Sequence, residues 1–96
     1  MIVDDEHFNL QALRVIFRYI FELADQNMVI SAKNGLEALN IVKEDIKANN
    51  FCYSSFALIL MDCNMPQMDG YKATTKIRQY LHNQRISQPI ICAVTG

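Results

Sequence analysis

The sequence lacks an excess of charge of either sign. Nine Lys and Arg residues stand against ten Asp and Glu residues, so the 96-residue chain has a formal net charge of −1 at pH 7. Proteins that hold nucleic acid or an anionic membrane through electrostatics carry a concentrated basic charge, which this chain does not have. We therefore expect no nucleic acid partner and no direct membrane contact.

Long apolar runs are absent as well. The longest fall far short of the ~20 residues that a membrane-spanning helix needs. No internal repeat, low-complexity tract or linker interrupts the chain, and its length allows one domain with one hydrophobic core. Cysteine is scarce: Cys52, Cys63 and Cys92 are odd in number and form no CxxC pair. Asp4 and Asp5 come too early for a secretory signal peptide. The cysteines are therefore interpreted as free thiols in a reducing compartment, which predicts a cytoplasmic location.

What the sequence does contain is a regular alternation of two apolar patterns. Short apolar runs predict strands at residues 1–3, 28–32, 56–61 and 90–94. Apolar residues at helical spacing predict helices at 7–23, 36–46 and 71–81. The order βαβαβαβ predicts an α/β fold, a parallel sheet with helices on both faces. The run at 56–61 is unbroken, as expected for a strand that is buried on both faces.

The first helix is predicted to turn one apolar stripe toward the sheet, with Asp5 as its N-cap. The stripe consists of Leu10, Leu13, Ile16 with Phe17, Ile20 and Leu23.

Polar residues follow three of the predicted strands. Asp4 and Asp5 follow the first, Asp62 ends the third and Thr95 follows the fourth. Parallel neighbours bring these ends to one edge of the sheet, where open α/β sheets bind their ligands. Three carboxylates there repel one another unless a cation shares them, and a small set of oxygen ligands suits Mg²⁺. A carboxylate beside Mg²⁺ can attack phosphorus to form an aspartyl phosphate, to which Thr95 could donate a hydrogen bond. These residues together predict a charge-triggered switch.

Taken singly, the same residues have simpler interpretations. Asp4-Asp5 is most often a strand-to-helix turn, Asp62 a loop residue and Thr95 a turn residue, and Asp69-Gly70 is interpreted as turn chemistry. His7 and His82 have no partner at a spacing that suits a metal site or a triad. The methionines Met61, Met65 and Met68 are interpreted as packing residues. Only the joint placement of the acidic residues and Thr95 at strand ends favours a functional site.

These motifs resemble the receiver domain of two-component response regulators, in particular the receivers of hybrid histidine kinases. Residues 3–6 resemble the family's first strand and acidic pair, and residues 34–39 its entry into the second helix. Residues 61–70, MDCNMPQMDG, match its phosphoacceptor loop, and residues 89–96 resemble its fourth strand and switch hydroxyl. The resemblance extends over essentially the whole chain.

The resemblance implies a flavodoxin-like (CheY-like) fold with sheet order 2-1-3-4-5. It makes Asp62 the phosphoacceptor, Asp4 and Asp5 the acidic pair that holds Mg²⁺, Asn64 a metal ligand through its backbone carbonyl, and Thr95 the switch hydroxyl. The phosphodonor would be a phosphohistidine on a histidine kinase or a histidine phosphotransfer protein. The chain would then be a cytoplasmic module of a phosphorelay or the cytosolic part of a larger sensor kinase.

The resemblance stops after the fourth strand. The family's fourth helix, fifth strand and fifth helix have no counterpart here, so residues 1–96 are expected to form a receiver domain without its last helix-strand-helix. The lysine that contacts the phosphoryl group, the aromatic switch partner and the common output surface belong to that part. The fourth strand is then expected to be an exposed apolar edge, prone to pairing.

Three functions are weighed from the sequence. The first is a phosphoaccepting receiver, a switch rather than a turnover enzyme. The second is a receiver-like interaction module that is never phosphorylated, since the lysine and the output surface are missing. The third, a Mg²⁺-dependent phosphohydrolase with an Asp nucleophile, is disfavoured because Asn64 stands where such enzymes usually place an acid.

Overall fold

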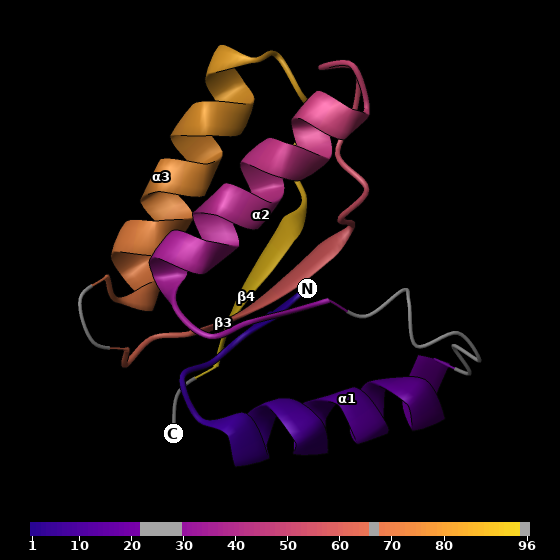
Figure 1. The fold of residues 1–96 in the computed structure, drawn as a ribbon, viewed down its shortest axis with the longest axis vertical. Helices are drawn as coiled ribbons and strands as arrows, with labels where there is room; N and C mark the ends of the chain where they lie inside the picture. Colours follow the sequence, from indigo (N-terminus) through magenta and orange to yellow (C-terminus); the bar gives the residue numbers. More distant parts are fainter. Residues whose placement is uncertain (22–29, 66–67, 95–96) are drawn as a thin grey trace.

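The computed structural model describes residues 1–21, 30–65 and 68–94 (Figure 1). Strands and helices alternate along this part of the chain in the predicted order, with boundaries that differ from the prediction by a few residues. The elements are β1 (Ile2–Val3), α1 (His7–Phe21), β2 (Ser31–Ala32), α2 (Gly35–Ala48), β3 (Leu58–Asp62), α3 (Gly70–Asn83) and β4 (Ile90–Val94).

The four strands form one parallel sheet in the order β2-β1-β3-β4. Val3 at the end of β1 lies opposite Met61 in β3, and Asp62 at the end of β3 lies opposite Val94 in β4. The first four positions of a flavodoxin-like sheet are therefore present, as predicted. This register places Asp4, which directly follows β1, beside Asp62.

One face of the sheet carries most of the hydrophobic core. Helices α2 and α3 lie side by side over it, whereas α1 lies on the opposite face (Figure 1). Val3, Ile59 and Met61 point to the α2/α3 face and are almost completely buried. Side chains from both helices pack on them, among them Ala38, Val42, Ile46, Ala73, Ile77 and Leu81. Met65, also buried, and Met68 join this cluster, which confirms their interpretation as packing residues.

On the α1 face, the described part of the predicted stripe is buried only in part. Ile2 packs on Leu10 and the half-buried Leu13, but Ile16 is 48% exposed, so its assignment to the buried stripe is wrong. Steps of three residues fall short of a 3.6-residue turn by about 60° each, so Ile16 lies about 120° around the helix from Leu10. Leu23 lies outside the described residues.

Strand β3, which was predicted to be buried on both faces, is also buried only in part. Ile59 is buried under α2 and α3, but Leu58 and Leu60 on the other face are only half-buried. On that face, the described side chains of α1 that pack in a core cluster, Leu10 and Leu13, contact Ile2 of β1.

Strand β4 lies at the edge of the described sheet. Ile90 is 66% exposed, and Cys92 and Ala93 are also exposed, which confirms the predicted apolar edge. All three cysteines are free thiols. Within the described ranges, no helix is both long and apolar enough to cross a bilayer.

Candidate functional site

Asp4 is the most firmly held carboxylate at the carboxyl edge of the sheet. Its side chain is only 5% exposed. Oδ1 accepts a hydrogen bond from the backbone N–H of Glu6 at 2.9 Å, and Oδ2 accepts one from the side-chain amide of Asn9 at 3.4 Å. Both oxygens are therefore oriented by the first turn of α1 and the segment that leads into it.

Asp5 does not have the capping role that the sequence suggested. Helix α1 begins at His7, and the N–H of Leu10 donates to the carbonyl of Glu6 at 3.1 Å, so Glu6 occupies the N-cap position. Asp5 lies one residue earlier and is exposed. The turn is made instead by the Asp4 side chain, which accepts from the N–H two residues on, as in an Asx turn.

Asp62 completes an acidic cluster with Asp4 and Asp5. It is the last residue of β3, it is half-buried, and its Oδ1 accepts a hydrogen bond from the backbone N–H of Asn64 at 3.1 Å. Each of the three aspartates offers one oxygen, and these three atoms lie within 4.8 Å of one another. The predicted convergence of the strand ends is therefore present for all three carboxylates.

Burial is the main cause that raises the pKa of Asp62 above its ordinary value of 3.8, and the negative charges of Asp4 and Asp5 act in the same direction. The N–H of Asn64 opposes the shift by stabilising the charged form. Ionised carboxylates that lie this close repel one another, and a bound cation would relieve that repulsion.

The donor set fits Mg²⁺. Oxygen ligands of one Mg²⁺, at bond lengths of about 2.0–2.1 Å, lie about 3 to 4 Å apart, so oxygens within 4.8 Å of one another need only a small inward shift. Carboxylate oxygens are the ligands that such hard cations prefer. Asn64 is exposed. The role of its backbone carbonyl as a metal ligand stays a prediction. Thr95 lies outside the described residues, directly after Val94, which pairs with Asp62.

The loop after Asp62 is closed by a glycine with no space for a side chain. A Cβ atom on Gly70 would lie 2.1 Å from the carbonyl oxygen of Asp62 and 2.9 Å from the Cα of Cys63. The N–H of Gly70 also donates to the carbonyl of Cys63 at 3.4 Å. The start of α3 therefore rests directly on the backbone that carries Asp62.

Asp69, predicted only as a turn residue, is the N-cap of α3, because its side chain accepts a hydrogen bond from the backbone N–H of Lys72 at 2.8 Å. We expect Asp69→Ala to lower the free energy of unfolding by about 0.5–2 kcal/mol, the usual loss when a cap is removed. Urea denaturation measures the change. The control is Lys76→Ala at an exposed position within the same helix, which should change stability little. Equal stability of Asp69→Ala and the wild type would contradict the capping role.

Other residues of the site were not found from the sequence. Asn9, in the first turn of α1, donates a hydrogen bond to Asp4. The one feature of the sequence that could have indicated this contact is an amide side chain shortly after the acidic pair. Tyr71, although 67% exposed, meets the buried thiol of Cys63 next to Asp62. The neighbouring thiol of Cys63 is the main cause that raises the pKa of Tyr71. Nothing in the local sequence predicts these contacts, because they depend on how α1 and α3 meet the sheet.

The sequence matches the family described as the response regulator receiver domain over residues 1–96. Hybrid signal transduction histidine kinase B of Dictyostelium discoideum is 34% identical over 92 residues, 93% of this chain and 4% of that protein. Chemotaxis protein CheY of Halobacterium salinarum is 36% identical over 96 residues, 100% of this chain and 66% of that protein.

Solved structures show the same fold. The receiver domain of the histidine kinase CKI1 from Arabidopsis thaliana, complexed with Mg²⁺ and BeF₃⁻, has a TM-score of 0.86 at 30% identity; the similarity covers 99% of this chain and 63% of that one. The same domain complexed with Mg²⁺ has a TM-score of 0.87 at 29% identity, over 99% and 65% of the two chains. This chain therefore spans at most 66% of the length of each of these relatives.

Proposed function

Because the chain belongs to the response regulator receiver domain family of two-component signalling, we propose that it accepts a phosphoryl group on Asp62 in a Mg²⁺-dependent reaction. The observation that carries this proposal is the meeting of Asp4, Asp5 and Asp62 within 4.8 Å at the carboxyl ends of β1 and β3. The CKI1 receiver domain, of similar fold, was crystallised with Mg²⁺. Residues 1–96 are proposed to be the part of a receiver domain up to its fourth strand.

The proposed reaction transfers a phosphoryl group from a histidine nitrogen of the donor to a carboxylate oxygen of Asp62. The N–H of Asn64 holds Oδ1 of Asp62, which leaves the other carboxylate oxygen freer to attack phosphorus. The new bond is P–O, the bond that breaks is P–N of a phosphohistidine, and the departing imidazole keeps the electron pair. Asp4, Asp5, Asp62 and the carbonyl of Asn64 would hold Mg²⁺, which neutralises charge on the phosphoryl oxygens when bound. Thr95 is proposed as the hydroxyl that donates to the phosphoryl group afterwards.

This function makes the chain a signalling acceptor rather than a turnover enzyme. Its donor would be a histidine kinase or a histidine phosphotransfer protein. The direct test is treatment with acetyl phosphate and Mg²⁺ followed by peptide mapping of the modified residue. The phosphate is expected on the peptide that contains Asp62, and a phosphate only on other peptides would contradict the proposal.

One observation favours a second candidate, an interaction module that is never phosphorylated. Among the described residues, no Lys or Arg side chain forms an ion pair with Asp62, so no such pair is in place to stabilise a phosphoryl group on it. A folded chain that binds Mg²⁺ but takes up no phosphate would support this candidate.

The metal site makes a separate prediction. Asp5→Asn should weaken Mg²⁺ binding by about tenfold or more, because it removes one of three anionic ligands from a site with few. Glu6→Gln is the matched control, since Glu6 is the adjacent carboxylate and stands outside the cluster. Titration calorimetry or amide chemical shifts measure both affinities. Equal weakening by the two substitutions would mean that Mg²⁺ responds only to overall charge.

A further inference from the structure

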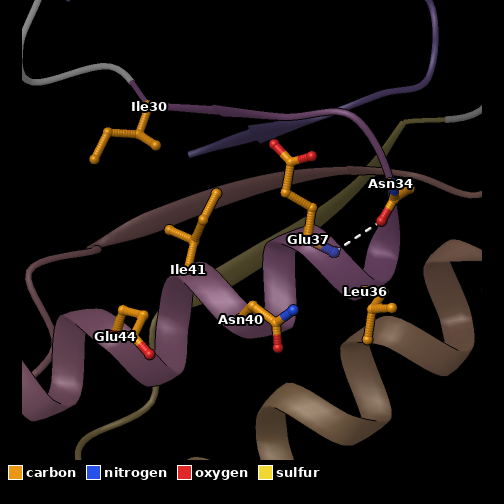
Figure 2. A pocket seen from close by; sticks show the side chains of 7 residues that line it. All are labelled: Ile30, Asn34, Leu36, Glu37, Asn40, Ile41 and Glu44. Carbon is orange, nitrogen blue, oxygen red and sulfur yellow. Dashed lines mark hydrogen bonds between the residues drawn. The ribbon is translucent and has the colours of Figure 1, made fainter.

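A shallow groove lies between α2 and the segment that carries Ile30. Its volume is about 610 Å³, and its walls come from Ile30 on one side and from Leu36, Glu37, Asn40, Ile41 and Glu44 of α2 on the other. Figure 2 shows Glu37 and Ile41 extending from α2 toward the segment that carries Ile30. Asn34, at the mouth of the groove, caps α2 by accepting a hydrogen bond from the N–H of Glu37 at 2.7 Å. The groove is distinct from the acidic cluster, with which it shares no residue.

Apolar side chains stand on both walls of the groove, Ile30 on one and Leu36 and Ile41 on the other. Leu36 is 50% exposed, Ile30 is 40% exposed and Ile41 is half-buried. Single exposed apolar residues are common on protein surfaces, but neighbours that line one groove are typical of binding sites. The opposite face of α2 already packs in the core through Ala38 and Val42. Leu36 is therefore not needed to hold α2 on the sheet, whereas the half-buried Ile41 also packs against that core.

The charge of the groove has one sign. Among the described residues that line it, Glu37 and Glu44 are the charged ones. They stand seven residues apart, so they lie on the same side of α2 with a separation along the axis of about 10 Å. Within the described part of the chain, Glu37 has no ion pair, and Glu44 meets only Lys47, at 3.6 Å between two exposed side chains. Such exposed pairs are weak and exchange readily, so both carboxylates are available to an incoming cation.

The shape of the groove favours a helix as its occupant. The α2 wall extends from Leu36 to Glu44, about 12 Å of helix. The regular part of β2 is only two residues long, too short an edge for the addition of an extended strand. We propose that this groove binds an amphipathic helix of a partner protein, with apolar side chains against Ile30, Leu36 and Ile41 and Lys or Arg residues facing Glu37 and Glu44. This is the helix-in-groove mode with a complementary charge pattern. It does not depend on phosphorylation of Asp62.

The test uses the full chain, labelled with ¹⁵N, and a synthetic 14-residue helical peptide with leucines on one face flanked by lysines. The peptide should bind saturably, and the amides that shift should be those of Ile30 and residues 34–44. A second peptide, with every lysine replaced by glutamate, should bind at least about tenfold more weakly, because it loses two ion pairs and adds repulsion.

Variants of the groove then separate it from acidic surface in general. Glu37→Gln with Glu44→Gln should weaken binding about three- to tenfold, and Leu36→Ser about tenfold. Two controls should keep the wild-type affinity: Phe51→Ser, which removes a 49% exposed aromatic ring elsewhere, and Glu6→Gln, which removes an exposed carboxylate beside the acidic cluster. The spectrum of each variant shows whether it is folded. Binding that maps to the acidic cluster, equal affinity for both peptides, unchanged affinity in the groove variants or no saturable binding would each overturn the proposal.

Discussion

Replacing Asp62 with asparagine is expected to abolish phosphate incorporation while leaving the metal-free fold as stable as the wild type or more stable. The amide cannot act as the nucleophile, so no adduct should form. It also removes one charge from a cluster of three carboxylates whose oxygens lie within 4.8 Å of one another. The gain in the free energy of unfolding should be small, about 0.2–1 kcal/mol, because the half-exposed side chain is screened by solvent.

The gain in the free energy of unfolding that Asp62→Asn brings should increase with pH. The pKa of Asp62 is raised in the folded chain, so the folded state holds this proton more tightly than the unfolded state. The carboxyl therefore costs no stability below its ordinary pKa of 3.8, and it becomes destabilising as the pH rises through the folded pKa. The difference between Asp62→Asn and the wild type should be absent below pH 3.8 and fully developed once the pH exceeds the folded pKa of Asp62.

Urea denaturation over a pH series, without divalent cations, measures this difference. Glu44→Gln serves as a control for the loss of one exposed negative charge away from the cluster, and its effect should change little with pH. Added Mg²⁺ should stabilise the wild type more than Asp62→Asn and so reduce the difference between their free energies of unfolding. A marked loss of stability in Asp62→Asn, at any pH, would contradict the repulsion between the three carboxylates.

Gly70→Ala is expected to have the largest effect on the fold around the site. The new methyl group would lie 2.1 Å from the Asp62 carbonyl oxygen and 2.8 Å from its carbonyl carbon. These are backbone atoms of β3, which cannot turn aside as a side chain can. Overpacking of this kind costs about 1–3 kcal/mol or more, and the backbone that carries Asp62 has to shift. Mg²⁺ affinity and phosphate incorporation should fall together with stability.

Two comparisons make this prediction specific. Lys72→Ala, in the same turn of α3 and exposed, should leave stability and Mg²⁺ affinity unchanged. Gly35→Ala should have an intermediate effect on stability, since its added Cβ would lie 2.8 Å from the Ala73 Cβ and from the Met68 carbonyl oxygen. Wild-type stability and Mg²⁺ affinity in Gly70→Ala would mean that the loop has space that the structure does not show.

The alternation of strands and helices could be predicted because it depends on local patterns. The apolar run before Asp62 and the helical spacing of Leu39, Val42 and Ile46 each mark their element without knowledge of the rest. The meeting of the three aspartates follows from one additional rule, that parallel strands end at the same edge. This is why the acidic cluster was accessible from the sequence.

The details that failed depend on contacts between elements. Ile16 is an exception, because its exposure follows from helix geometry alone: it lies about 120° around α1 from Leu10, away from the side that packs on the sheet. Asp5 was expected to cap α1, whereas the Asp4 side chain makes the turn and is held there by Asn9. The need for glycine at position 70 comes from the close approach of α3 to β3, which no local pattern encodes.

The most direct test of the central claim is the intact mass of the purified, folded chain after treatment with acetyl phosphate, with and without Mg²⁺. We expect one added phosphate, present only with Mg²⁺, stable in acid, labile in base and absent from Asp62→Asn. Uptake that does not need Mg²⁺ or that persists in Asp62→Asn would contradict Asp62 as a metal-dependent acceptor. No uptake by a chain shown to be folded and to bind Mg²⁺ would contradict it equally and would favour the interaction module.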